Sequence, residues 1–122
     1  MDLIMFSEEE VVKQQLISAV QMAHLSGSIE IYPTPETFYQ RLRQPRRFGT
    51  IVIIALKQRR TLETFSQAKE LLKDVRTIIV PPDDDMETIV KAHLLRPRFV
   101  IFKEDISGKL SMVLTKMNCS GN

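Results

Sequence analysis

The chain has 122 residues, which is the size of one domain with a hydrophobic core of its own. Its 43% hydrophobic and 26% charged residues are typical of a globular protein and argue against intrinsic disorder. The formal net charge of +2 gives no electrostatic reason to expect nucleic acid or a membrane as partner. Cys119 is the single cysteine and no apolar run is long enough to span a bilayer, so we expect a cytoplasmic protein without disulfides.

The first half of the chain predicts two units of a strand followed by a helix. The strands are short apolar runs, and the helices repeat apolar residues every three or four positions. Ser7 and Thr34 are the predicted N-caps, and Pro35 suits the first position of the second helix. The units are strand 3–6 with helix 8–23, and strand 28–32 with helix 35–44.

Three further units are predicted in the second half. They are strand 50–56 with helix 61–73, strand 77–80 with helix 83–95, and strand 99–102 with helix 107–117. In the fourth helix, Met86, Val90 and Leu94 have the spacing of a core stripe. We assign residues 1–117 to one domain and residues 118–122 to a flexible tail.

Five alternating strands and helices in one domain predict an α/β fold with right-handed crossovers. The strands are apolar throughout, which is typical of a parallel sheet that is covered on both faces. Five such units in a chain of this length favour the flavodoxin-like (βα)5 three-layer sandwich with strand order 2-1-3-4-5. The first and fifth helices are then expected on the same face.

With strands that end near positions 6, 32, 56, 80 and 102, the layout of nearly the whole chain resembles the receiver domain of response regulators. In that family an acidic pair follows the first strand and a phosphoacceptor Asp ends the third. A Ser or Thr follows the fourth strand, and a Lys follows the fifth. The resemblance implies where the corresponding residues of this sequence should be sought.

Part of that pattern is present. Ser7 and Glu8 follow the first strand, where a carboxylate could reach a cation at the strand ends or could simply favour the start of the next helix. Lys103 follows the fifth strand and matches the lysine that contacts the phosphoryl group in the family. It could equally form an ion pair with Glu8 or Glu104.

The residues on which phosphorylation depends are absent. The third strand ends in Ala55, Leu56 and Lys57, with no carboxylate near them. Pro81 and Pro82 follow the fourth strand in place of a hydroxyl residue. Without a carboxylate nucleophile no aspartyl phosphate can form. The resemblance therefore implies a degenerate pseudo-receiver, and we predict neither a cofactor nor a metal site.

Two functions remain open. The first is a non-catalytic signalling or regulatory module that acts by protein–protein contact. The second is a small-ligand or anion-binding domain, possibly enzymatic, that uses the carboxyl ends of the strands, where open α/β sheets bind ligands. Residues that could line such a site are Ser7, Glu8, Lys57, Asp83 and Lys103.

The resemblance also implies a contact surface, because receivers commonly dimerise through the fourth helix, fifth strand and fifth helix. The fifth strand is an edge strand in the predicted order, and edge strands are usually covered or paired. We therefore expect a homodimer or a protein partner on this face. The candidate interface residues are Ile89, Lys91, His93, Arg98, Ile101 and Glu104.

Basic residues flank the predicted third strand. Arg46 and Arg47 precede it, whereas Lys57, Arg59 and Arg60 follow it. A strand of this length holds its ends roughly 20 Å apart, so the two groups cannot form one compact patch. This separation is a further reason to expect no nucleic-acid partner.

Overall fold

The computed structural model describes residues 2–24 and 27–119. Within them, five parallel strands form one sheet in the order β2-β1-β3-β4-β5. The predicted flavodoxin-like fold and its strand order are thereby confirmed. The strands are β1 (Leu3–Ser7), β2 (Ile29–Tyr32), β3 (Ile51–Ala55), β4 (Arg76–Val80) and β5 (Phe99–Val100).

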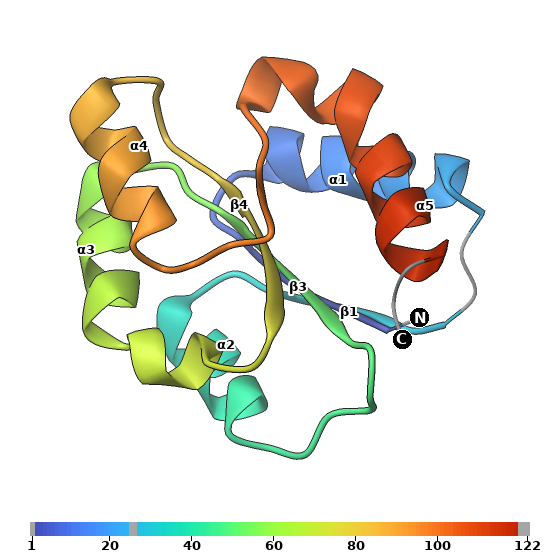
Figure 1. Cartoon of the computed structure of the whole chain (residues 1–122), viewed down its shortest axis with the longest axis horizontal. Coiled ribbons are helices and arrows are strands. Elements are labelled where there is room, and N and C mark those ends of the chain that lie inside the picture. The colour runs from blue at the N-terminus through green and yellow to red at the C-terminus, as the bar shows by residue number, and fades with distance from the viewer. Residues whose placement is uncertain (1, 25–26, 120–122) are drawn as a thin grey trace.

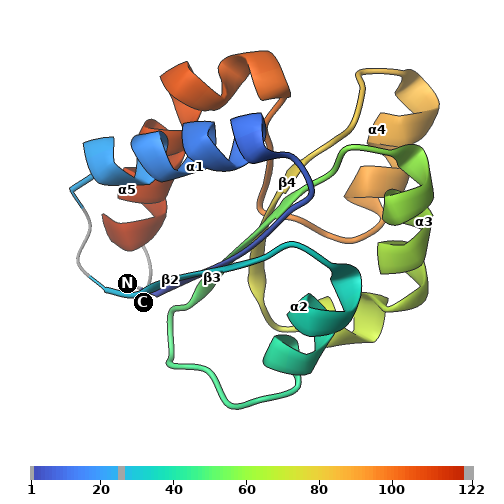
Figure 2. The same cartoon turned by 180° about the vertical axis from the view of Figure 1, so that it is seen from behind.

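Helices cover both faces of the sheet, as Figures 1 and 2 show. One face carries α1 (Glu10–Met22), the 3-10 turn η2 (Lys103–Asp105), the π-helical turn η3 (Ile106–Leu110) and α5 (Ser111–Cys119). The other carries α2 (Pro35–Leu42), α3 (Arg59–Gln67), the 3-10 turn η1 (Lys69–Leu72) and α4 (Met86–His93). The first and last helices therefore share a face, as predicted.

The central strand β3 supplies side chains to both layers of the core. Ile51, Ile53 and Ala55 point toward α1 and α5, whereas Val52 and Ile54 point toward α2, α3 and α4. All five residues of the strand are buried. This is why its sequence is apolar without alternation.

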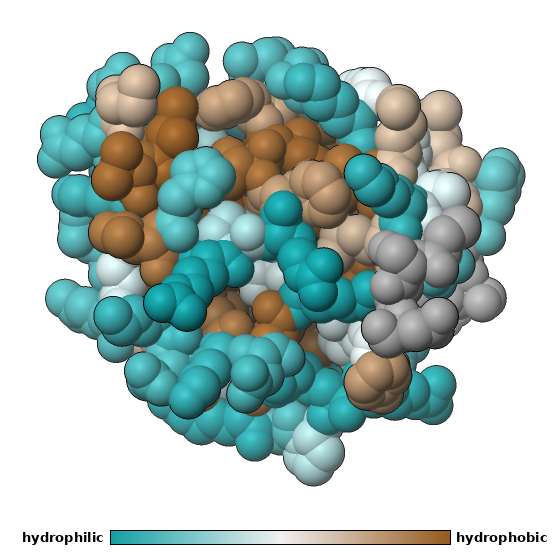
Figure 3. All heavy atoms as spheres, viewed as in Figure 1, coloured by the Kyte–Doolittle hydropathy of each residue, from teal (hydrophilic) through white to brown (hydrophobic). Residues whose placement is uncertain are grey.

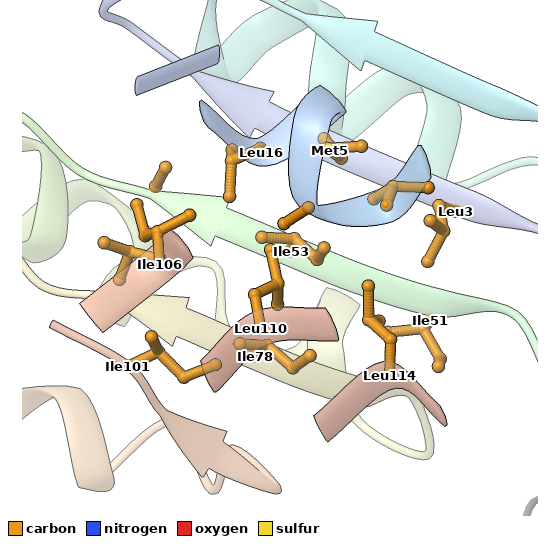
Figure 4. Close-up of a cluster of buried hydrophobic side chains, with 14 of the residues drawn as sticks. Leu3, Met5, Leu16, Ile51, Ile53, Ile78, Ile101, Ile106, Leu110 and Leu114 are labelled. Carbon is orange, nitrogen blue, oxygen red and sulfur yellow. The ribbon is translucent and has the colours of Figure 1, made fainter. Parts of the chain in front are cut away.

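The two cores differ in composition. Between the sheet and α1, η3 and α5 the side chains are aliphatic, and Figure 4 shows ten of them labelled around Ile53. The opposite core contains three phenylalanines in mutual contact, Phe6 of β1, Phe38 of α2 and Phe65 of α3. Their ring centroids are 5.1–5.8 Å apart. Edge-on contacts of this kind add stabilisation beyond the area that they bury.

Of the two predicted N-caps, Thr34 is confirmed and Ser7 is wrong. Thr34 is the N-cap of α2, and its Oγ1 accepts a hydrogen bond from the Thr37 amide at 3.3 Å, with Pro35 at the first position. Ser7 does not cap α1, because it is the last residue of β1 and its Oγ donates to the Glu9 carbonyl. Helix α1 accordingly begins at Glu10.

The predicted core stripe of the fourth helix is wrong. Met86, Val90 and Leu94 are 74%, 52% and 69% exposed. The helix is rotated so that Thr88 and Ala92 face the core instead. Small side chains there let α4 lie close to the sheet, whereas the sequence pattern alone favoured the larger residues.

Several boundaries also differ from the prediction, including the start of α4 at Met86 rather than residue 83 and the start of α5 at Ser111 rather than residue 107. The fifth strand has two paired residues rather than four, because the chain turns into η2 after the amide of Ile101 donates to the carbonyl of Ile79. The third helix ends at Gln67 and continues as the separate turn η1. Asn118 and Cys119 belong to α5 rather than to a tail, and residues 120–122 lie outside the described part. No helix in the described part is long and apolar enough to cross a membrane.

We expect Ile53→Ala and Leu72→Ala each to lower the free energy of unfolding by roughly 2–5 kcal/mol, because each truncation leaves a cavity among buried side chains. The matched control is Val11→Ala on the exposed side of α1. This substitution should change the free energy of unfolding by less than about 0.5 kcal/mol. Urea denaturation followed by circular dichroism measures all three. A wild-type midpoint for Ile53→Ala would contradict the assignment of β3 as the central strand.

Candidate functional site

The carboxyl ends of the strands bring together the residues that the sequence comparison with receivers singled out. Ser7, Ala55 and Val80 are neighbours across β1, β3 and β4. The loops that follow these strands, and the turn after β5, therefore surround one edge of the sheet. This edge is the candidate site.

Apolar residues occupy the centre of that edge. Ala55 and Leu56 are buried, and the Leu56 amide donates to the carbonyl of Val80 at 2.9 Å. Pro81 is buried beside them, and Pro82 is half-buried. The ends of β3 and β4 thus present neither a nucleophile nor a hydroxyl group.

Glu8 is engaged with the start of α3. Its carboxylate accepts hydrogen bonds from the backbone amide of Lys57 and from Oγ1 of Thr61, both at 3.1 Å. Gln58, the residue before the helix, provides no side-chain cap. Glu8 therefore connects the loop after β1 to the segment that leads into α3.

Lys103 is paired with Glu9 rather than with Glu8 or Glu104, the two partners suggested by the sequence. Its Nζ lies 2.6 Å from Oε1 of Glu9. Glu8 is turned toward Lys57 and Thr61, which leaves Glu9 as the carboxylate within reach. This ion pair connects the loop before α1 to the turn after β5.

Arg59, at the start of α3, forms ion pairs with the loop that follows β4. Its Nε lies 2.8 Å from Oδ2 of Asp83, and its Nη2 contacts Asp85. The guanidinium group of Arg59 lowers the pKa of Asp83 to about 2. Arg59 thus neutralises two carboxylates of the loop after β4.

These contacts decide whether the site suits a divalent cation of the kind that receiver chemistry uses. Both carboxylate oxygens of Glu8 accept protein hydrogen bonds, and Glu9 is neutralised by Lys103. In the described part of the chain, no group of three or more acidic, histidine or cysteine side chains could hold a metal ion. The residues present do not fit such a cation, and we derive no chemistry through one.

The six candidate interface residues do not form one surface. Ile89 is half-buried on α4, while His93 and Glu104 are exposed. Lys91 is directed toward α3 by its ion pair with Glu63.

Ile101 and Arg98 must be removed from that set. Ile101 is only 3% exposed and belongs to the core beneath α1 and α5, so it cannot contact a partner. Arg98 lies at the start of β5, in a groove at the opposite, amino end of the sheet.

Sequence reasoning missed two features. One is the exposed apolar row of Met86, Val90 and Leu94, because their spacing is the same for a core stripe and for an exposed stripe. The other is the groove that Arg98 lines together with Arg76. The positions of these arginines directly before two parallel strands were a signal, since such residues meet at the amino edge of a sheet.

No family model matches the sequence, and no curated protein sequence matches it. Five chains of solved structure match the fold. One of them is a response regulator receiver domain from Rhodospirillum rubrum, with a TM-score of 0.74 and 12% sequence identity over 98% of this chain and 94% of that one. At this identity the likeness establishes the fold alone: this chain has the fold of a receiver domain.

We expect Asp83 to titrate with a pKa of about 2 and Arg59→Gln to raise that pKa toward the usual value near 3.8. Because the pKa is lower in the folded state, the stabilisation is complete above about pH 4 and is lost as the pH falls toward 2. The NMR shift of the Asp83 carboxyl carbon, followed across this pH range, gives the pKa of Asp83 in the wild-type protein and in Arg59→Gln. Arg60→Gln is the control, since the Arg60 guanidinium donates to Gln58 and its loss should leave Asp83 unchanged.

Proposed function

We propose that this chain is a non-catalytic, receiver-like signalling module that acts by protein contact and is not phosphorylated on Asp. The observation that carries the proposal is the end of β3, where buried Ala55 and Leu56 stand at the place of the phosphoacceptor in receivers. The receiver fold supports a signalling role. The apolar strand end argues that the input is something other than phosphoryl transfer.

The alternative of a ligand site at the carboxyl ends of the strands has weaker support. Glu8, Asp83 and Lys103 each already bind a partner from a neighbouring loop. A ligand that binds to these side chains would have to displace the contacts that hold the loops together. We therefore place the contact surface of the module elsewhere.

The face of α4 is the strongest candidate for that surface. Met86, Val90 and Leu94 follow one another at four-residue spacing and are all exposed. Figure 3 shows apolar side chains gathered at the upper left, where Figure 1 places α4. A contiguous apolar row on a small domain is typical of a binding surface.

A second copy of the chain is the partner that we propose for this face. β5 is the edge strand of the sheet, and its two residues pair only with β4. A two-fold axis beside α4 would place each apolar row against its equivalent, which is self-complementary by symmetry. Glu87 and Lys91 on the same helix carry opposite charges that would lie at the rim of such an interface.

Acetyl phosphate or beryllofluoride with magnesium should leave the protein unmodified, because no carboxylate stands at the end of β3. Intact mass should show no phosphorylated species, and amide shifts around Lys103 should stay constant. A receiver domain that retains its phosphoacceptor Asp, treated in parallel, is the positive control. A covalent phosphoryl adduct would refute the proposal.

We expect the purified protein to sediment as a dimer at high micromolar concentration and Val90→Glu to shift it to monomer, because a charge would be buried in the centre of the apolar row. Val11→Glu, an equally exposed change on α1, should leave the dimer intact. Sedimentation velocity distinguishes these cases. A monomeric wild-type protein would rule out the homodimer and leave only a different protein on this face.

A further inference from the structure

The amino end of the sheet, opposite the candidate site, contains a groove of about 710 Å³. It is formed by the loop between α2 and β3, the turn before β4 and the turn before β5. Its arginines come from all three segments: Arg43, Arg46, Arg47, Arg76 and Arg98. Basic residues are divided between the two ends of β3, and Arg76 and Arg98 join the group at the amino end.

Most of the positive charge of this groove is not paired with a carboxylate of the described residues. Asp74 is the only acidic residue in its lining. Within residues 2–24 and 27–119, only Arg47 of the five arginines has a carboxylate within 4 Å, Asp2 at 3.6 Å. Arg41, close by on α2, shows the contrast, because its Nε lies 2.6 Å from Glu30. The groove is thus a concentrated site of uncompensated guanidinium charge.

Arg76 is held in place for contact with an anion. Its Nη1 donates to the carbonyl of Met117 at 3.0 Å, and its Nη2 contacts the carbonyl of Gly49. Partial burial and the neighbouring charge of Arg98 lower the pKa of Arg76. The Arg76 guanidinium has neutral backbone partners and lies near the charge of Arg98, so this pair gains most from an anion that both groups can approach.

Phe48 adds an aromatic ring at the rim of the same groove. It is 91% exposed, and it directly precedes Gly49, whose φ of +86° shapes the loop. A ring beside arginines offers a stacking surface to a planar base, while guanidinium groups bind phosphate through paired hydrogen bonds. An acidic peptide would satisfy the arginines but would leave the ring without a specific partner.

We propose that this groove binds a nucleotide, with the phosphate held by Arg76 and Arg98 and the base stacked on Phe48. The ligand chemistry is a phosphate joined to a planar base. A free mononucleotide and a single-stranded nucleic acid both supply it. The site is independent of the proposed signalling function, since it lies at the other end of the sheet from the receiver-like pocket.

The test uses nitrogen-labelled protein titrated separately with AMP, an eight-nucleotide oligouridylate, inorganic phosphate and an octaglutamate peptide. We expect shifts of the Arg76 and Arg98 Nε–H signals and of the Phe48 amide with AMP, the oligouridylate or both. Shifts with AMP identify a mononucleotide site, and shifts with the oligouridylate alone identify a strand site. Affinity should fall with added salt, as it does for phosphate contacts.

Four substitutions at three exposed positions test the roles without threatening the fold. Phe48→Leu keeps an apolar side chain but removes the ring and should weaken binding about tenfold, whereas Phe48→Trp should retain it. Arg98→Gln should weaken binding by a similar factor. Arg60→Gln removes the same charge at the opposite end of the sheet and should have no effect. Arg76 is not substituted, because its two backbone contacts stabilise the fold.

Several results would overturn the proposal. One is the absence of shifts at these three residues with both AMP and the oligouridylate. Another is equal weakening by Arg60→Gln and Arg98→Gln, which would mean nonspecific attraction. If phosphate binds as tightly as AMP and Phe48→Leu has no effect, the base plays no part. Binding of octaglutamate alone would assign the groove to an acidic protein segment.

Discussion

The burial of β3 on both faces is the constraint on which the rest of the molecule depends. A strand with no exposed face cannot carry a charge along its length, and each of its side chains must match the packing of one of two cores. Ile53 meets the aliphatic core beneath α1 and α5, and Val52 meets the core that contains the three phenylalanines. Because β3 contacts both cores, it fixes the helices on one face of the sheet relative to the helices on the other face.

That constraint also shapes the edge where β3 ends. Receivers interrupt the apolar strand end with a carboxylate that is stabilised by its surroundings. Here Ala55 and Leu56 continue the core to the end of the strand. The polar groups of the surrounding loops bind one another instead, as Glu8 binds the Lys57 amide and the Thr61 hydroxyl. The edge that performs chemistry in receivers serves here to join loops, so the candidate binding surfaces are the apolar row on α4 and the arginine groove at the amino end of the sheet.

The fold could be predicted from sequence because local signals and packing agree. Thr34 followed by Pro35 marks the start of α2, and uniformly apolar runs mark buried parallel strands. The rotation of α4 could not be predicted, since Met86, Val90 and Leu94 fit an exposed row as well as a buried one. The arginine groove was missed for a different reason. Arg76 and Arg98 are distant from the arginines of the α2–β3 loop in sequence, and only the parallel register of the strands brings them together.

The basic residues on either side of β3 have a consequence for the chain before it folds. The segment 50–56 is uncharged, lacks proline and is rich in β-branched residues, which favours pairing with other copies of itself. Two parallel strands can pair only after the helix that connects them has folded back across the sheet. This segment therefore stays unpaired until late in folding. Arg47 on one side and Lys57 on the other would repel the same residues of an approaching chain. The central strand therefore carries its own protection against aggregation during synthesis.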